Sequence, residues 1–162
     1  MNDSVPAQFD LNFRPNVELI SLVRRFVTEF YERVLTDRDA VARLALATHE
    51  LLENAVKYSV DGGTSLSIAV DRSASEAVVS LRISNRTESH HLEAVAAFFR
   101  ELQDFADPLE HYRHLMQRTL TLSEGSGLGL ARVRAEGEML MSYEVEGDRV
   151  MIQASTAVGD AS

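Results

Sequence analysis

Residues 49–59 read HELLENAVKYS and lie in a segment whose apolar residues recur every three or four positions. This spacing predicts a helix that begins after Thr36 and Asp37 and runs to about Tyr58. The expected buried stripe of this helix is Val41, Leu44, Ala45, Thr48, Leu51, Leu52, Ala55 and Val56. The helix is long enough to form one main support of a core, and its polar residues are candidates for a site.

Glu50 and Asn54 are four residues apart, so they project from one stripe of this helix, which Arg43 and Lys57 share. We expect this polar stripe nearly opposite the buried one. A solvated helix face would explain such a pair equally well, so the pair alone does not establish a site.

The flanking segments predict one sheet and several further helices. Alternating apolar residues place strands at 9–13, 66–70 and 79–83, the last two paired antiparallel, with a closing hairpin at 143–152. Three-four spacing predicts a first helix that Asn16 caps and that runs to Val34.

A long excursion at 85–124 contains two amphipathic segments that look helical but not obviously part of the core. A further helix is expected at about 128–138. This order of elements predicts an α/β two-layer sandwich, with a mostly antiparallel mixed sheet and the helices on one face. The domain is expected to span residues 9–156, between an N-terminal tail at 1–8 and a small, polar, frayed C-terminal tail at 157–162.

Residues 125–130 read GSGLGL, and their three alternating glycines come immediately before a predicted helix. Glycine lets backbone amides approach a ligand closely, and a helix N-terminus favours anions, so phosphate is the expected ligand. A plain loop that starts a helix is the alternative. The spacing does not fit a dinucleotide fingerprint, and the phosphate-loop lysine is missing.

Composition excludes several classes of protein. The chain has 162 residues, is 45% apolar and carries a net charge of -9, which repels nucleic acid and anionic membranes. It has no cysteine, so disulfides, thiolate catalysis and cysteine-ligated zinc are ruled out. The N-terminal residues do not resemble a signal peptide, and no run of about 20 apolar residues suggests a membrane span. We expect one cytoplasmic domain.

HELLENAVKYS resembles the Glu-x-x-x-Asn box of the GHKL ATPases, and GSGLGL resembles their second glycine box. The preceding helix and its spacing from the box are similar to the anti-sigma-factor serine/threonine kinase branch. The resemblance covers roughly residues 9–154. It implies a Bergerat-type ATP-binding fold in which an insert at about 86–124 forms a helical lid.

This resemblance also implies roles for individual residues. Asn54 would hold Mg²⁺ on the triphosphate of ATP, Glu50 would be the general base, and Lys57 would add positive charge near the phosphates. The phosphates would lie against the glycine box, which consists of Gly125, Ser126, Gly127, Leu128, Gly129 and Leu130.

The main departure from the family lies at residues 85–89. The family has Asp-x-Gly-x-Gly there, and its aspartate accepts a hydrogen bond from the adenine amino group; this chain has Asn85-Arg86-Thr87-Glu88-Ser89. Asn85 still offers a carbonyl oxygen to adenine, but Thr87 and Ser89 add side chains where the family keeps none.

Two functions therefore stay open. One is an anti-sigma-type kinase that phosphorylates or sequesters a STAS-domain antagonist or a sigma factor, and the other is an inactive module that only binds proteins. A homodimer through the first helix or a sheet edge is expected by analogy. Two minor alternatives are a metal site among the insert histidines His90, His91, His111 and His114, and a zincin-like helix, which lacks its second histidine.

Overall fold

The computed structural model describes residues 7–14, 17–72, 75–119 and 127–159. In chain order the elements are β1 (Ala7–Phe13), α1 (Val17–Val34), α2 (Arg38–Tyr58), β2 (Thr64–Arg72), β3 (Glu76–Arg86), α3 (Ser89–Leu102), α4 (Pro108–Thr119), α5 (Leu128–Ala135), β4 (Leu140–Glu146) and β5 (Arg149–Gly159). The expected helices and strands are all present. The residue predicted to cap the first helix, Asn16, lies outside the described residues.

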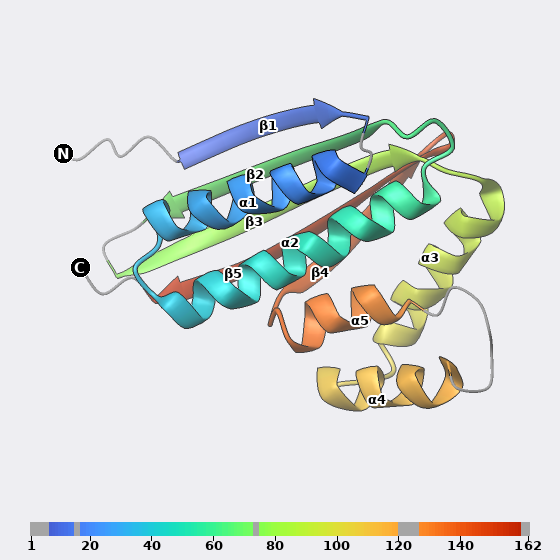
Figure 1. Ribbon diagram of the computed structural model, residues 1–162. Helices are drawn as coiled ribbons and strands as arrows, with labels where there is room; N and C mark the ends of the chain where they lie inside the picture. The colour runs from blue at the N-terminus through green and yellow to red at the C-terminus, as the bar shows by residue number, and fades with distance from the viewer. Residues whose placement is uncertain (1–6, 15–16, 73–74, 120–126, 160–162) are drawn as a thin grey trace.

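The strands form one sheet in the order β1-β2-β3-β5-β4, and each of the four described ladders is antiparallel. The helices lie on one face of this sheet (Figure 1). The predicted α/β two-layer sandwich is confirmed, and its described strands contain no parallel pair. Two of the four pairs, β2–β3 and β4–β5, are hairpins, in which a short turn reverses the chain, while helices lie between the strands of the other two pairs in sequence.

The core lies between the sheet and the α1–α2 pair. Leu81 of β3 is opposite Ile68 of β2 and Ala154 of β5, and all three are fully buried. Between the helices, the buried Tyr31 hydroxyl and the Thr48 hydroxyl share a hydrogen bond of 2.9 Å. Such a satisfied polar pair fixes how α1 sits on α2, because an unpaired hydroxyl would be costly there.

The start of α2 confirms the sequence prediction. Asp37 adopts an extended conformation, and its carboxylate accepts hydrogen bonds from the backbone amides of Asp39 and Ala40. These amides have no partner within the helix, so the cap stabilises the first turn. The cap fixes the phase of α2, and with it the direction in which Glu50 points.

Three expectations were wrong in part. The helical insert belongs to the core, since Val95, Phe98 and Phe99 of α3 and Leu115 of α4 are buried. Both tails are shorter than expected. Ala7 and Gln8 belong to β1, and Ala157, Val158 and Gly159 belong to β5. The last helix ends at Ala135 and not near Glu138, because Glu138 takes a left-handed conformation with φ of 55°.

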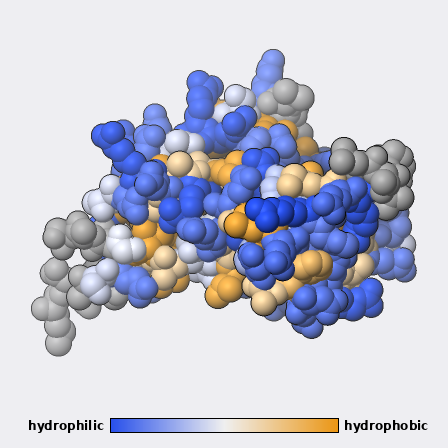
Figure 2. All heavy atoms as spheres, turned by 90° about the horizontal axis from the view of Figure 1, so that it is seen from below, coloured by the Kyte–Doolittle hydropathy of each residue, from blue (hydrophilic) through white to orange (hydrophobic). Residues whose placement is uncertain are grey.

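The surface is mostly hydrophilic on the face that Figure 2 shows, with separate hydrophobic patches. On α1 the large apolar residues Leu19, Leu22 and Phe26 are exposed, and the Phe26 ring contacts Phe9 of the edge strand β1 with a centroid distance of 4.9 Å. Among the described residues, no helix is both long enough and apolar enough to cross a membrane.

Candidate nucleotide site

Glu50 lies in the middle of α2 and is largely covered, with 13% of its side chain exposed. Its Oε1 accepts a hydrogen bond of 2.6 Å from Nη1 of Arg132 on α5. The prediction that the stripe of Glu50 lies opposite the buried face was therefore wrong, because α5 packs on this side of α2. The structure thus holds Glu50 at the contact between two helices.

The glycine turn meets α2 and α3 at the start of α5. Gly127 caps α5 with φ of 69°, and a Cβ on Gly127 would lie 2.9 Å from the Phe98 ring. A Cβ on Gly129 would lie 3.0 Å from Oε2 of Glu50. Gly127 is required by its left-handed conformation and by the nearby Phe98 ring, and Gly129 is required by the close approach of the Glu50 carboxylate. Gly125 and Ser126 lie outside the described residues.

Asn54 lies one turn after Glu50 on α2 and is half-buried. Its amide makes no hydrogen bond to any residue that the structure describes, so its oxygen can bind a ligand such as Mg²⁺. Lys57 is exposed, and its ammonium lies 5.2 Å from the centre of the Tyr58 ring. Leu128 is half-buried and Leu130 is buried, so the latter packs in the core. The structure brings together Glu50, Gly127 and Gly129 from the expected set.

The segment that replaces the family's adenine motif is tied to its neighbours. Asn85 is buried at the end of β3, and its amide donates to the backbone oxygen of Arg86 at 3.3 Å. Thr87 is also buried; its hydroxyl donates to the backbone oxygen of Tyr58, and its amide donates to that of Asp148, both at 2.8 Å. Thr87 therefore joins the end of α2 to the β4–β5 turn.

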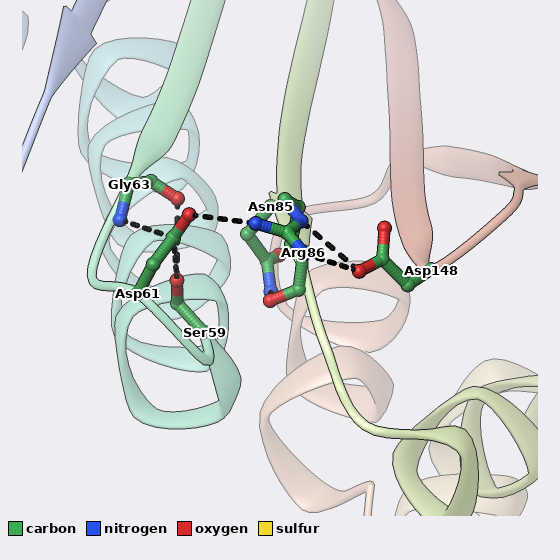
Figure 3. A network of polar contacts seen from close by, with 6 residues as sticks. All are labelled: Ser59, Asp61, Gly63, Asn85, Arg86 and Asp148. Carbon is green, nitrogen blue, oxygen red and sulfur yellow. Dashed lines mark hydrogen bonds and ion pairs between the residues drawn. The ribbon is translucent and has the colours of Figure 1, made fainter.

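Arg86 extends this connection on the surface, as Figure 3 shows. Its Nη2 lies 2.8 Å from the Asp148 carboxylate and its Nη1 lies 3.5 Å from that of Asp61, which in turn accepts from the Gly63 amide. The hydrogen bond to Arg86 lowers the pKa of Asp148, and the hydrogen bond from Gly63 lowers that of Asp61. Two turns and the end of β3 are held together at this segment.

His91 of α3 stacks on Tyr58 at the end of α2, with ring centroids 3.7 Å apart and planes inclined by 12°. His91 is buried, and this burial, with smaller effects from His90 and Lys57, lowers its pKa to about 4. The stacked pair joins the end of α2 to the start of α3.

His91→Phe should make the domain less sensitive to acid. The unfolded histidine titrates near pH 6.5 and the folded one near pH 4. Between these values the unfolded chain binds more protons, so stability falls as the pH falls. Phenylalanine can still stack on Tyr58 but takes up no proton. Melting curves from pH 7 to 4.5 should therefore show the variant gaining about 1–2 kcal/mol relative to the wild type.

His90→Gln is the matched control, because His90 is adjacent in sequence but its side chain is 75% exposed. This control should stay close to the wild-type curve, because His90 has only a smaller effect on the pKa of His91 than burial has. A His91→Phe variant that loses stability in parallel with the wild type at every pH would contradict the assignment of a neutral His91.

The other insert histidines do not form a metal site within the described part of the chain. His111 is fully buried between the Phe98 and Phe105 rings, with its Nε2 3.3 Å from Oε1 of Glu101. Glu101 also pairs with Arg118 at 3.0 Å. The Arg118 guanidinium competes with any metal for the Glu101 carboxylate. We therefore interpret the contacts of His111 and Glu101 as interactions that hold α3 and α4 together.

Sequence reasoning missed Arg132, and it considered His91 only as a possible metal ligand. Arg132 lies three residues after Gly129, which places the two on one face of α5. That spacing could have indicated that the arginine points toward the same neighbour as the glycine. The partner itself could not be foreseen, because it depends on how α5 packs on α2.

The antiparallel sheet and its single helical layer form an open α/β sandwich, in which Glu50 meets Gly129 at the start of α5. The model of the histidine kinase-like ATPase domain matches residues 13–153, and the chain belongs to this family. A chain in the crystal structure of the SiaB–SiaC complex from Pseudomonas aeruginosa has a similar fold, with a TM-score of 0.63 and 13% sequence identity over 93% of this chain and 89% of that chain. No curated protein matches this chain significantly.

Proposed function

We propose that this domain binds Mg-ATP and transfers the γ-phosphoryl group to a serine or threonine of a partner protein. The observation that carries the proposal is the position of Glu50, whose carboxylate lies against Gly129 at the start of α5. Gly127 and Gly129 lie at the N-terminus of α5, and a helix N-terminus suits phosphate. Asn54, one turn along α2, adds an oxygen suited to Mg²⁺.

In this proposal Glu50 accepts the proton of the partner's hydroxyl as its oxygen forms a bond to the γ-phosphorus. The bond from that phosphorus to the β,γ-bridging oxygen breaks, ADP leaves, and the proton passes from Glu50 to solvent. Bound Mg²⁺ would neutralise charge on the phosphate oxygens. Asn54 would hold this ion, and the amides after Gly127 would orient the phosphates.

The partner we propose is a STAS-type antagonist or a sigma factor, which this domain would phosphorylate or sequester in a partner-switching system. The similar fold of a chain crystallised within the SiaB–SiaC complex supports a protein partner. The net charge of -9 argues against direct binding of nucleic acid. A homodimer stays a prediction. The exposed apolar residues of α1, beside edge strand β1, would form its interface.

A second function, an inactive protein-binding module, is favoured by the altered adenine motif. Thr87 is hydrogen-bonded to the end of α2, and the His91–Tyr58 pair lies beside it. These contacts occupy room that a nucleotide base needs. If the base pocket is closed, the domain keeps at most the phosphate half of its site.

Thermal melting with Mg-ATP, Mg-ADP, Mg-GTP and inorganic triphosphate separates the two functions. A ligand at about 100 times its dissociation constant adds about 2.7 kcal/mol to stability, so ATP should raise the melting temperature clearly. A larger shift with ATP than with GTP shows a working base pocket. Equal shifts with all triphosphates show phosphate binding alone, and no shift with any of them contradicts the kinase proposal.

A further inference from the structure

Arg132 connects the site to a second carboxylate on its own helix segment. Its Nη1 lies 2.6 Å from Oε1 of Glu50, and its Nη2 lies 3.2 Å from Oε2 of Glu136. One third of its side chain, 33%, is exposed, against 13% for Glu50. The guanidinium is therefore shared between α2 and the end of α5, and it covers the carboxylate that the proposed reaction needs.

Gly129 and Arg132 lie on the same face of α5, and both meet the Glu50 carboxylate. One carboxylate oxygen lies beside the Cα of Gly129, while the other accepts from Arg132. The carboxylate, the glycine and the guanidinium therefore meet at the first turn of α5. A phosphate cradled by this turn would be next to both charged groups.

Arg132 keeps its positive charge in this position. Burial lowers its pKa, but the hydrogen bond to Glu136 and the charges of Glu50 and Glu136 outweigh this effect and raise the pKa above its ordinary value. Its Nε is buried and makes no hydrogen bond to a described residue. Arg132 is thus always positively charged, and its Nε–H is a donor that no described residue uses.

The chemistry of phosphoryl transfer limits how far the terminal phosphate can be from Arg132. A general base lies about 2.6–3.2 Å from the hydroxyl it deprotonates, and that hydroxyl lies about 3–3.5 Å from the phosphorus it attacks. The phosphorus is therefore within about 7 Å of the Glu50 carboxylate, which accepts a hydrogen bond from Arg132. Because Glu50 and the phosphate repel each other, a cation that can contact both is favourable.

We infer that Arg132 recognises the terminal phosphate of the nucleotide: it pairs with Glu50 when no nucleotide is bound and moves to the γ-phosphate of ATP, which frees Glu50 to act as the base. This inference rests on the proposed nucleotide binding. It makes Arg132 the residue that distinguishes a triphosphate from a diphosphate. Glu136 keeps the guanidinium close to the site during the exchange.

Arg132→Gln tests this role by calorimetric titration with Mg-ATP and Mg-ADP. Losing a charge-assisted contact to the γ-phosphate should weaken ATP binding by about tenfold to a hundredfold, while ADP binding changes less than about twofold. Arg132→Lys, which keeps the charge without the planar fork, should lie between the two. Melting curves show that each variant is folded at the titration temperature.

Arg43→Gln is the matched control. Arg43 lies on α2, its side chain is also 33% exposed, and it pairs at 2.9 Å with Glu138 beyond the end of α5. Its loss removes the same charge and a similar ion pair without touching Glu50, so both nucleotides should bind as they do to the wild type.

If Arg132→Gln binds ATP as well as the wild type, or loses affinity for ATP and ADP equally, the inference about Arg132 is wrong, but the proposed nucleotide binding stands. If the wild type binds neither nucleotide, the inference fails together with the proposed function. The ratio of the ATP and ADP dissociation constants thus separates the two failures.

Discussion

Glu50→Gln is expected to lower the rate of Mg-ATP turnover by about 10²–10⁴-fold without weakening ATP binding. Glutamine has the shape of glutamate, and its oxygen can still accept the hydrogen bond that Arg132 donates to Glu50. It cannot take a proton from an attacking hydroxyl or water. Release of inorganic phosphate from Mg-ATP, followed with and without a candidate partner, measures the effect.

The control for this substitution is Glu53→Gln on the same helix. Glu53 has 57% of its side chain exposed and pairs with His49 at 3.1 Å, away from the glycine turn. Its substitution should leave turnover within about twofold, because a solvated carboxylate contributes little. Equal turnover by Glu50→Gln and the wild type would show that Glu50 is not the general base and serves only in the ion pair with Arg132 that joins α2 to α5.

The α1–α2 pair and the strands could be predicted from sequence because their patterns are local. Val23, Val27 and Tyr31 follow one another at intervals of four residues, and this spacing identifies a buried helix face without knowledge of the partner. Alternation in β2 and β3 works in the same way. The C-terminal end was misread because its residues are small, and only the ladder to β3 shows that Val158 pairs with Ala77.

The position of the insert could not be predicted from its pattern. The apolar spacing in α3 shows a helix with one apolar face, but not what that face covers. In the fold, Phe99 stacks on Tyr143 of β4 with ring centroids 4.6 Å apart, a contact between residues far apart in the chain. The burial of α3 therefore depends on its packing against the edge strand β4, which its own sequence does not reveal.

The site itself was predictable only in part. Glu50 and the glycine turn were paired through resemblance to a family, and the structure brings Glu50 within contact of Gly129. The pattern of the chain could place Arg132 only on the face of α5 that carries Gly129, and an arginine on a short helix is usually solvated. A long-range ion pair depends on the docking of α5 on α2, which no local signal contains.

Asn54→Ala is expected to abolish the magnesium-dependent part of ATP binding. A hundredfold loss of affinity would reduce the stabilisation by ATP from about 2.7 to about 0.4 kcal/mol at the same concentration. The reason is the loss of the one amide oxygen on α2 that lies a turn from Glu50. Melting curves with Mg-ATP, and with ATP plus a chelator, measure this loss.

The fold should tolerate this change, because the Asn54 side chain is half-buried and bonds to no described residue, and alanine favours a helix interior by up to about 0.7 kcal/mol. Asn54→Asp, which keeps an oxygen ligand and adds a charge suited to Mg²⁺, should retain the ATP-induced shift. A loss of about 2–5 kcal/mol in Asn54→Ala without ligand would instead identify a packing residue. A full ATP shift in that variant would place the metal elsewhere. Only an unchanged fold with a lost shift in Asn54→Ala and a retained one in Asn54→Asp makes this residue the metal ligand.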